Sequence, residues 1–291
     1  MEPLARRSGA IHSASSALRG LSIATSLGAL VSATGCARPV ANAGPPIPAA
    51  KADQEDRPFR LLPPFELAST EDAIVRIVSD VTCTGTLIAE DLVLTAHHCV
   101  AARDEGGRTL RRDKDPEDIS IELGGDYLPW GEVKIQSIVS PDCGYTSGEG
   151  DIAILVLSRR LIGIPTLTPR LEAEPVRSEL VDPVGFGRCA LSADAIHRVR
   201  RAGGRIEAVS ASDFIVDASI CPGDSGGPAF SRDRGDVVGV ISASVMDSDE
   251  NTTGASYFTR LDLWRELFSA AREIAAGASP SELPPYRSCQ R

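Results

Sequence analysis

Short apolar runs rich in β-branched residues recur along the chain from about residue 70 onward, and Gly, Pro, Asp and Ser separate them. Many short strands with turn residues between them predict an all-β barrel or sandwich. The expected strands are residues 74–78, 86–88, 92–95, 119–123, 133–139, 152–157, 180–187, 204–210, 214–218, 237–242 and 256–259.

Only the C-terminal end of the chain has a helical pattern of apolar positions. Its apolar residues at steps of three to four are Leu263, Leu267, Ala271 and Ile274, with Trp264 and Phe268 on an adjoining stripe. This spacing predicts a single amphipathic helix. We expect Asp262 to cap its start and Gly277 to end it.

Residues 1–36 have the features of an export signal. Three arginines and a single acid precede an apolar run at residues 21–31, which ends in small residues before Cys36. This arrangement is typical of a cleaved secretory signal, and the run is too short for a membrane-spanning helix. Residues 33–36, Ala-Thr-Gly-Cys, resemble the bacterial lipobox, which implies that Cys36 is lipidated. The alternative is ordinary signal cleavage that leaves Cys36 as a free thiol.

Residues 37–69 form a segment rich in Pro and Ala between the signal and the strands. Such a segment buries too little apolar surface to order itself and stays extended. We interpret it as a tether or a cleaved pro-segment, which leaves one domain at residues 70–291. Both export routes place that domain in an oxidising compartment, either lipid-anchored in the bacterial cell envelope or secreted.

The composition of the 291 residues excludes several classes of function. The net charge is −10 and the sequence pI is about 5.0, which argues against a partner nucleic acid because a nucleic-acid binder presents a basic face. The chain has no phosphate loop, zinc cluster or dinucleotide fingerprint, so we expect neither a cofactor nor a metal. Aromatic residues are 4% of the chain, and the core must consist mainly of Val, Ile, Leu and Ala.

A pair of histidines closes one expected strand. His97 and His98 follow the apolar residues 92–96, and Cys99 comes directly after them. By itself such a pair more often packs in a core or binds a metal. Cys83 lies 16 residues before Cys99, however, which indicates a disulfide across a hairpin that pins the loop carrying the histidines.

Asp151 directly precedes the apolar residues 152–157. An Asp that enters such a strand is drawn towards the interior, where a carboxylate must be hydrogen-bonded or paired. An imidazole N–H is a suitable partner. The alternative is that Asp151 is an ordinary turn or strand-entry residue.

The most specific motif is at residues 221–228, which read Cys-Pro-Gly-Asp-Ser-Gly-Gly-Pro. Glycines let the backbone bend sharply, so that successive N–H groups point into one concavity beside the Ser225 hydroxyl. An oxyanion hole requires such a nest of donors. A glycine-rich surface turn is the alternative.

The order His, Asp, Ser of these motifs resembles that of the chymotrypsin/trypsin family of serine proteases over roughly residues 70–276. The resemblance implies two packed six-stranded antiparallel β-barrels with a C-terminal α-helix. It also implies that Ser225 is the nucleophile, that His98 is the general base and acid, and that Asp151 orients the imidazole. The oxyanion hole would consist of the backbone N–H groups of Gly223 and Ser225.

The sequence departs from this family at the residues that support the site. No activation site precedes Cys83, so we expect Asp224 to pair with a cation other than the usual new N-terminal amine, either an Arg or an amine made by cleavage. The sequence does not identify that cation. We expect the basic stretch at residues 198–201, next to His197, to be a solvated loop; the alternatives are a proteolysis-prone loop and a small anion-binding patch. His97 stands where the family usually has a small residue. We therefore choose His98 as the catalytic histidine, because it directly precedes Cys99 as the family pattern requires.

The resemblance also predicts where a substrate binds. Residues 239–244 resemble the strand that pairs with the substrate backbone. Ser219 stands where trypsin-like members carry an acid. The residues expected to form the substrate pocket are Ser219, Ser242, Ser244 and Ser256. A neutral, partly filled pocket predicts small or medium uncharged residues before the scissile bond.

The chain has seven cysteines. If Cys36 is lipidated, six remain, and six allow 15 pairings. Besides Cys83 with Cys99, the family fold implies the pairs Cys189 with Cys221 and Cys143 with Cys289.

These observations together predict a serine endopeptidase that hydrolyses proteins or peptides through an acyl-enzyme without a cofactor. The alternatives are a catalytically silent homologue that binds peptides or proteins, and an esterase with little peptidase activity. The sequence does not predict an oligomeric state.

Overall fold

The computed structural model describes residues 69–125, 128–141, 149–189, 196–246 and 252–284. The expected signal at 1–36, the expected tether up to residue 68, and Cys143 and Cys289 lie outside these described residues. Within the described part of the chain, no helix is both long and apolar enough to cross a membrane.

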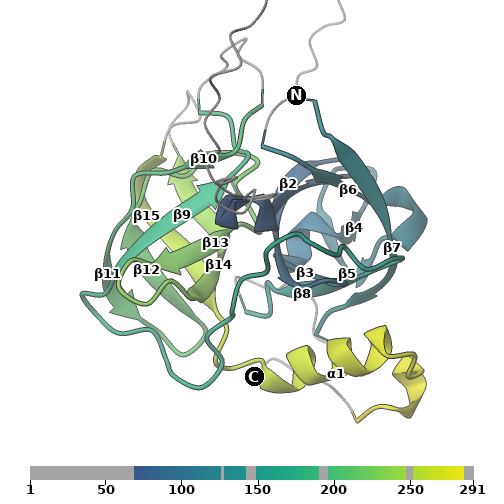
Figure 1. The fold of residues 1–291 in the computed structure, drawn as a ribbon. Helices are drawn as coiled ribbons and strands as arrows, with labels where there is room; N and C mark the ends of the chain where they lie inside the picture. Colours follow the sequence, from purple (N-terminus) through teal and green to yellow (C-terminus); the bar gives the residue numbers. More distant parts are fainter. Residues whose placement is uncertain (1–68, 126–127, 142–148, 190–195, 247–251, 285–291) are drawn as a thin grey trace, which may run out of the picture. The chain divides into compact units, whose positions relative to one another are not determined.

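Six strands form a closed antiparallel barrel in the order β1-β2-β3-β8-β7-β6 (Figure 1). These strands are β1 Ile74–Val78, β2 Thr82–Ala89, β3 Leu92–Thr95, β6 Ser120–Leu123, β7 Gly131–Val139 and β8 Ala153–Leu157. All residues of β3 and β8 are buried, which explains their uninterrupted apolar sequences. Two short strands, β4 Ala101–Arg103 and β5 Thr109–Asp113, pair with each other beside the barrel.

The second half of the chain forms a second barrel. Its strands are β9 Leu180–Gly185, β10 Val199–Arg200, β11 Gly204–Val209, β12 Asp213–Asp217, β13 Pro228–Ser231, β14 Val237–Met246 and β15 Thr252–Arg260. The order is β10-β9-β11-β12-β15-β14-β13, and pairing of β13 with β9 closes six of the strands into a barrel. Phe214 and Phe258 stack in its core with ring centroids 5.1 Å apart. Closure removes the free strand edges at which sheets aggregate.

The expected C-terminal helix is α1, Arg265–Ala275, and it packs on the first barrel (Figure 1). It ends as predicted: Gly277 has φ +103°, and the N–H of Ala278 donates to the carbonyl of Glu273. The predicted start is wrong. Trp264 is the N-cap, and the carboxylate of Asp262 accepts hydrogen bonds from Arg260 instead.

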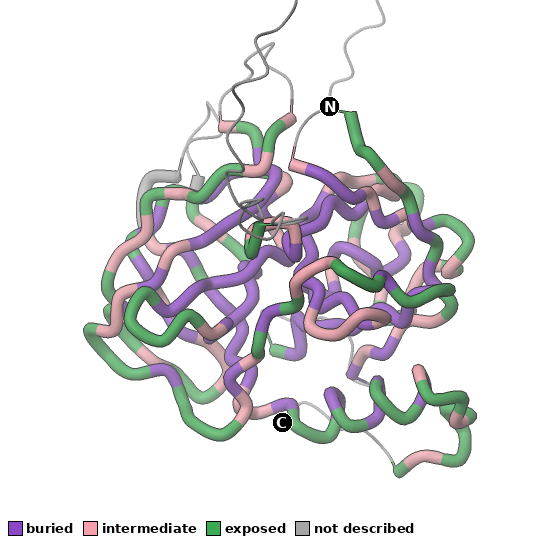
Figure 2. The backbone as a smooth tube through the Cα atoms, viewed as in Figure 1, coloured by how far each residue is buried: buried purple, intermediate pink, exposed green. Residues whose placement is uncertain are grey.

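The predicted all-β class with two six-stranded barrels and one terminal helix is therefore confirmed. Four strands were not predicted: β4, β5, β10 and β13. Strand β13 begins with a proline, and strands β4, β5 and β10 are short or polar. None of the four therefore has the apolar sequence pattern of a buried strand. Figure 2 shows buried backbone running through both barrels and exposed backbone around their outer turns.

Candidate active site

The loop that carries the two histidines leaves the first barrel at the end of β3. It forms a single 3-10 turn, His97–Cys99, and a disulfide joins Cys99 to Cys83 on β2. This is the first predicted disulfide. The bridge closes a short loop and ties the histidine turn to the barrel wall.

Asp151 lies beside this turn because β3 and β8 are neighbours. Thr95 pairs with Ala153, so the residues that follow β3 and precede β8 meet at one edge of the barrel. The Nδ1 atom of His98 lies 2.9 Å from Oδ2 of Asp151, and the His98 backbone N–H donates to Oδ1 over 2.9 Å. The Asp151 side chain is fully buried, while that of His98 remains 17% exposed.

The second barrel also holds Asp151. The hydroxyl of Ser242 on β14 donates to the Asp151 carboxylate, and Thr259 on β15 donates to its backbone carbonyl over 3.0 Å. Burial alone would raise the pKa of Asp151, but the neighbouring His98 and the hydrogen bonds from His98 and Ser242 outweigh it and hold the pKa below its usual value. Asp151 is therefore a carboxylate at neutral pH and can fix the orientation of the imidazole.

Ser225 lies on a tight turn at the entrance to β13. Gly223 and Gly226 have φ values of +101° and +83°, which favour glycine. A Cβ atom on Gly226 would lie 2.3 Å from the carbonyl oxygen of Thr84, so this position also lacks space for a side chain. The backbone N–H of Thr84 on β2 donates to the carbonyl of Ser225 over 2.8 Å, which joins the turn to the first barrel.

The backbone donors of this turn divide into two sets. The N–H of Asp224 donates to Cys221 and that of Gly226 donates to Ile241. Within the described part of the chain, no acceptor takes the N–H groups of Gly223 and Ser225. The two donors that an oxyanion hole needs are thus left available for a ligand.

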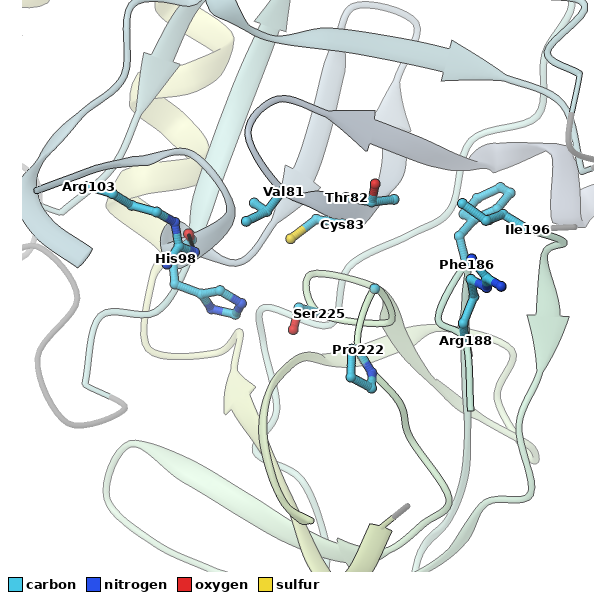
Figure 3. Close-up of a pocket in the computed structure, with 11 residues that line it drawn as sticks. Val81, Thr82, Cys83, His98, Arg103, Phe186, Arg188, Ile196, Pro222 and Ser225 are labelled. Atoms are coloured by element: carbon cyan, nitrogen blue, oxygen red, sulfur yellow. Dashed lines mark hydrogen bonds between the residues drawn. The ribbon is translucent and has the colours of Figure 1, made fainter. Parts of the chain in front are cut away.

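His98, Gly223 and Ser225 line the same cavity, which has a volume of about 470 Å³. Figure 3 shows the imidazole of His98 directed towards the hydroxyl of Ser225. The structure therefore brings together the three residues that the sequence singled out, with their backbones on two different barrels.

Asp224 is completely buried directly before Ser225, and its partner is Arg201. The guanidinium Nε lies 2.8 Å from Oδ2 and Nη2 lies 3.1 Å from Oδ1. The backbone N–H groups of Gly187 and Cys221 donate to the same carboxylate over 2.7 and 2.9 Å. Both carboxylate oxygens are satisfied, so no cleaved N-terminal amine is needed at this position.

The basic stretch that contains Arg201 is tied to the start of the domain. Arg198 lies 3.0 Å from Asp72, and Arg200 lies 3.1 Å from Glu71. The expectation of a solvated loop is therefore wrong for Arg198 and Arg201, whose side chains are largely buried, whereas Val199 and Arg200 are exposed. Two of its arginines bind the segment that precedes β1, and the third reaches the interior because the side chains alternate along an extended chain.

The four predicted pocket serines have different surroundings. Ser256 is buried and donates to the carbonyl of Ala218 over 2.9 Å, and its hydroxyl lies 3.2 Å from that of Ser244. Ser219 is exposed, and its backbone N–H donates to Ala202. The hydroxyl of Ser242 contacts Asp151, a role that the sequence did not assign to it.

His97 does not line the cavity that His98 and Ser225 share. Its side chain is fully buried, and its Nε2 lies 2.6 Å from Oδ1 of Asp113 on β5. The hydroxyl of Ser140 donates to the same carboxylate over 2.9 and 3.0 Å. His97 thus holds the histidine turn through Asp113, and of the two histidines only His98 contacts Asp151.

A second disulfide joins Cys189 to Cys221, as predicted. It ties the strand connection after β9 to the turn that carries Ser225. The sulfur atoms of Cys83 and Cys99 lie near His98, but they are bonded to each other and are therefore not available as thiolate ligands for a metal.

Two closed β-barrels, with a serine turn that shares a cavity with a histidine bonded to a buried aspartate, are characteristic of the chymotrypsin-like class of proteases. The family described as Trypsin matches residues 71–264. This match covers more than half of the 291 residues, and the chain belongs to the trypsin family.

Among curated proteins, the chain is similar to two described as "Peroxisomal leader peptide-processing protease". It is 30% identical to the Mus musculus protein over 183 residues and 28% identical to the Homo sapiens protein over 180 residues. Each alignment covers 60% of this chain and 27% of the relative. The chain thus spans about a quarter of the length of these relatives.

Solved structures share the fold at low identity. A Glu endopeptidase in complex with MPD has a TM-score of 0.56 at 17% identity, and the match covers 71% of this chain and 93% of the other. The structure described as human heparin binding protein has a TM-score of 0.55 at 19% identity, covering 72% and 93%. These likenesses support the two-barrel fold.

Proposed function

We propose that the chain is a serine endopeptidase in which Ser225, His98 and Asp151 act as a catalytic triad. The observation that carries the proposal is the cross-barrel arrangement of a buried Asp151, a partly exposed His98 bonded to it, and the Ser225 hydroxyl in the same cavity. A family fold alone does not determine activity. This arrangement of side chains, however, is suited to one reaction type, the attack of a serine hydroxyl on a carbonyl carbon with histidine as the base.

In this mechanism the hydroxyl oxygen of Ser225 bonds to the carbonyl carbon of the scissile peptide while its proton passes to Nε2 of His98. Asp151 accepts the hydrogen bond from Nδ1 and stabilises the imidazolium. The N–H groups of Gly223 and Ser225 bind the oxyanion. His98 then protonates the leaving amine as the C–N bond breaks, and water hydrolyses the acyl-enzyme with His98 again as the base.

The second candidate function is peptide binding without catalysis. One structure that shares this fold is named for heparin binding, so binding members of the fold are a reasonable comparison. The presence of all three triad side chains favours the enzyme. A chromogenic ester substrate separates the two: we expect a burst of about one leaving group per molecule, followed by slower turnover. Absence of both burst and turnover would support the binding protein.

His98 and His97 offer a matched pair of variants for this proposal. His98→Ala is expected to lower kcat by up to about 10⁶-fold, because triad members act as a unit. His97→Ala is expected to retain far more activity, since His97 contacts Asp113 and not Asp151. Thermal unfolding of both variants would separate loss of chemistry from loss of folding. Loss of activity in His97→Ala alone would reverse the assignment.

We further propose a preference for small or medium uncharged residues before the scissile bond. By resemblance to the family, Ser244 and Ser256 stand where glycines are usual; their hydroxyls lie 3.2 Å apart, and Ser219 supplies no charge. A Lys or Arg side chain would lie there unpaired. Cleavage of a peptide library, read by mass spectrometry, is expected to show Ala, Ser, Thr or Val at this position, and a profile dominated by Lys or Arg would contradict the proposal.

The domain is proposed to act outside the cytoplasm, lipid-anchored through Cys36 or secreted. Two disulfides among the described residues support folding in an oxidising compartment. The curated relatives are peroxisomal by name, so they do not support a bacterial envelope.

A further inference from the structure

The disulfide between Cys189 and Cys221 joins the two chain segments that hold the buried Asp224 carboxylate. In the first segment, the backbone N–H of Gly187 donates to this carboxylate over 2.7 Å. The second segment is the serine turn, residues 221–227, where the backbone N–H of Cys221 donates to the same carboxylate over 2.9 Å. Each half of the bridge is therefore a donor to Asp224 or lies within two residues of one.

Arg201 connects the bridge to Asp224 by a second route. Its Nη1 atom lies 3.4 Å from Sγ of Cys189, while its Nε and Nη2 atoms bind the carboxylate of Asp224. In the disulfide this sulfur carries no charge, so Asp224 is the anion that Arg201 neutralises. A cation beside a cysteine stabilises the thiolate. A reduced Cys189 would therefore become a second anion and compete with Asp224 for the same guanidinium.

The two disulfides among the described residues differ in exposure. Cys189 is partly exposed and Cys221 is 4% exposed, whereas Cys83 and Cys99 are 3% and 0% exposed. Exchange begins when a thiolate reaches one sulfur of a disulfide, and stabilisation of the reduced form makes a disulfide easier to reduce. Both the exposure of Cys189 and its arginine neighbour therefore favour reduction of this bridge over that of the other.

Building on the serine endopeptidase function proposed above, we propose that the bridge between Cys189 and Cys221 is a redox site at which a dithiol lowers turnover. A thiolate of the dithiol attacks Sγ of Cys189, the S–S bond breaks, and Cys221 leaves as a thiolate that takes up a proton. The second thiol of the dithiol loses its proton, attacks the mixed disulfide and releases Cys189 as a thiolate beside Arg201. The bridge gains two electrons, and the dithiol is oxidised to a disulfide.

Reduction is expected to act on the oxyanion hole. Gly223 and Ser225 flank Asp224 in the sequence, so a displaced Asp224 misaligns their N–H groups. We expect kcat to fall by about 10- to 100-fold, approaching the effect of losing one donor. The change in KM is expected to be smaller, because these donors act mainly on the transition state. A general loss of folded protein would instead lower the amount of active enzyme without this division.

The test follows kcat and KM of the full-length protein during a titration with dithiothreitol. Alkylation of parallel samples with iodoacetamide, followed by peptide mapping, identifies which cysteines are reduced at each step, and circular dichroism reports folding. We expect the fall in kcat to follow the reduction of Cys189 and Cys221 in protein that remains folded. Reoxidation should restore kcat.

Two double variants show which bridge is responsible. Cys189→Ser with Cys221→Ser removes the proposed site, and its activity is expected not to respond to dithiothreitol. Cys83→Ser with Cys99→Ser makes the same change at the other bridge and should still lose activity on reduction. The quantity compared is the ratio of reduced to oxidised activity within each variant, which does not depend on the starting activity. If the second variant does not fold, the first variant and the unmodified protein still decide the question.

The outcomes separate this inference from the proposed function. Unchanged kcat after reduction of Cys189 and Cys221 would overturn the redox site and leave the endopeptidase proposal standing. The same holds if kcat falls only when Cys83 and Cys99 are reduced, or if the bridge resists dithiothreitol until the protein unfolds. If the oxidised protein cleaves no peptide and takes up no fluorophosphonate, the proposed function fails, and the inference fails with it.

Discussion

Replacing Ser225 by Ala is expected to lower kcat by about 10⁶-fold, by analogy with other triad knockouts. The hydroxyl is the only part of the side chain that forms a bond with substrate in the proposed mechanism. The fold does not depend on it: the backbone of Ser225, not its side chain, contacts Thr84. We therefore expect the thermal midpoint of the variant to change little.

Ser158→Ala is the matched control for this variant. Ser158 is exposed directly after β8 and does not line the cavity, so the loss of the same hydroxyl is expected to leave turnover unchanged. Kinetics with a peptide and with an ester substrate would measure both variants. A Ser225→Ala protein that retains more than about 1% of kcat would show that another group attacks the carbonyl.

Replacing Arg201 by Leu is the second change with a large expected effect. It leaves the buried Asp224 carboxylate without its charged partner, and breaking such a pair costs roughly 3–5 kcal/mol of unfolding free energy. Asp224 lies between Gly223 and Ser225, whose N–H groups form the proposed oxyanion hole. A displaced turn is therefore expected to lower kcat by at least about 10²-fold, the usual cost of losing one donor.

Arg200→Leu is the control, because this neighbour pairs with the partly exposed Glu71 at the surface. An exposed pair contributes no more than about 1 kcal/mol, so its loss should hardly affect stability or kcat. Urea unfolding and kinetics on both variants test the contrast. If the two variants behave alike, Arg201 does not support the turn and another cation holds Asp224.

The double variant Arg201→Leu with Asp224→Asn adds a second check. A neutral amide in place of the carboxylate removes the uncompensated charge, so the loss of stability should be smaller than the sum of the two single losses. Additive losses would mean that Arg201 and Asp224 do not interact in solution.

Ser225, His98 and Asp151 could be singled out from the sequence because each has a local signal. Ser225 lies in a glycine-rich run whose turn needs positive φ values, and Asp151 precedes an entirely apolar strand. His98 is next to a cysteine with a partner 16 residues away. In each case the property that positions the residue is encoded within a few neighbouring residues. The order of the motifs along the chain then indicates the family resemblance.

The partner of Asp224 could not be predicted in the same way. Arg201 has two arginine neighbours within its stretch, and only the alternation of side chains after β10 sends it inward while Arg198 and Arg200 reach Glu71 and Asp72. That alternation depends on the pairing of β10 with β9, and a two-residue strand has no sequence signal. The contact between Ser242 and Asp151 likewise depends on how the two barrels pack.

Labelling with a fluorophosphonate probe tests the central claim most directly, because the probe reacts with a serine that an adjacent base has activated. We expect the purified full-length protein to take up one equivalent of probe, which peptide mapping assigns to Ser225. Ser225→Ala and His98→Ala should not be labelled, whereas Ser158→Ala should react like the unmodified protein. A folded protein that takes up no probe, or is labelled at another serine, would contradict the assignment of Ser225, His98 and Asp151 as one catalytic unit.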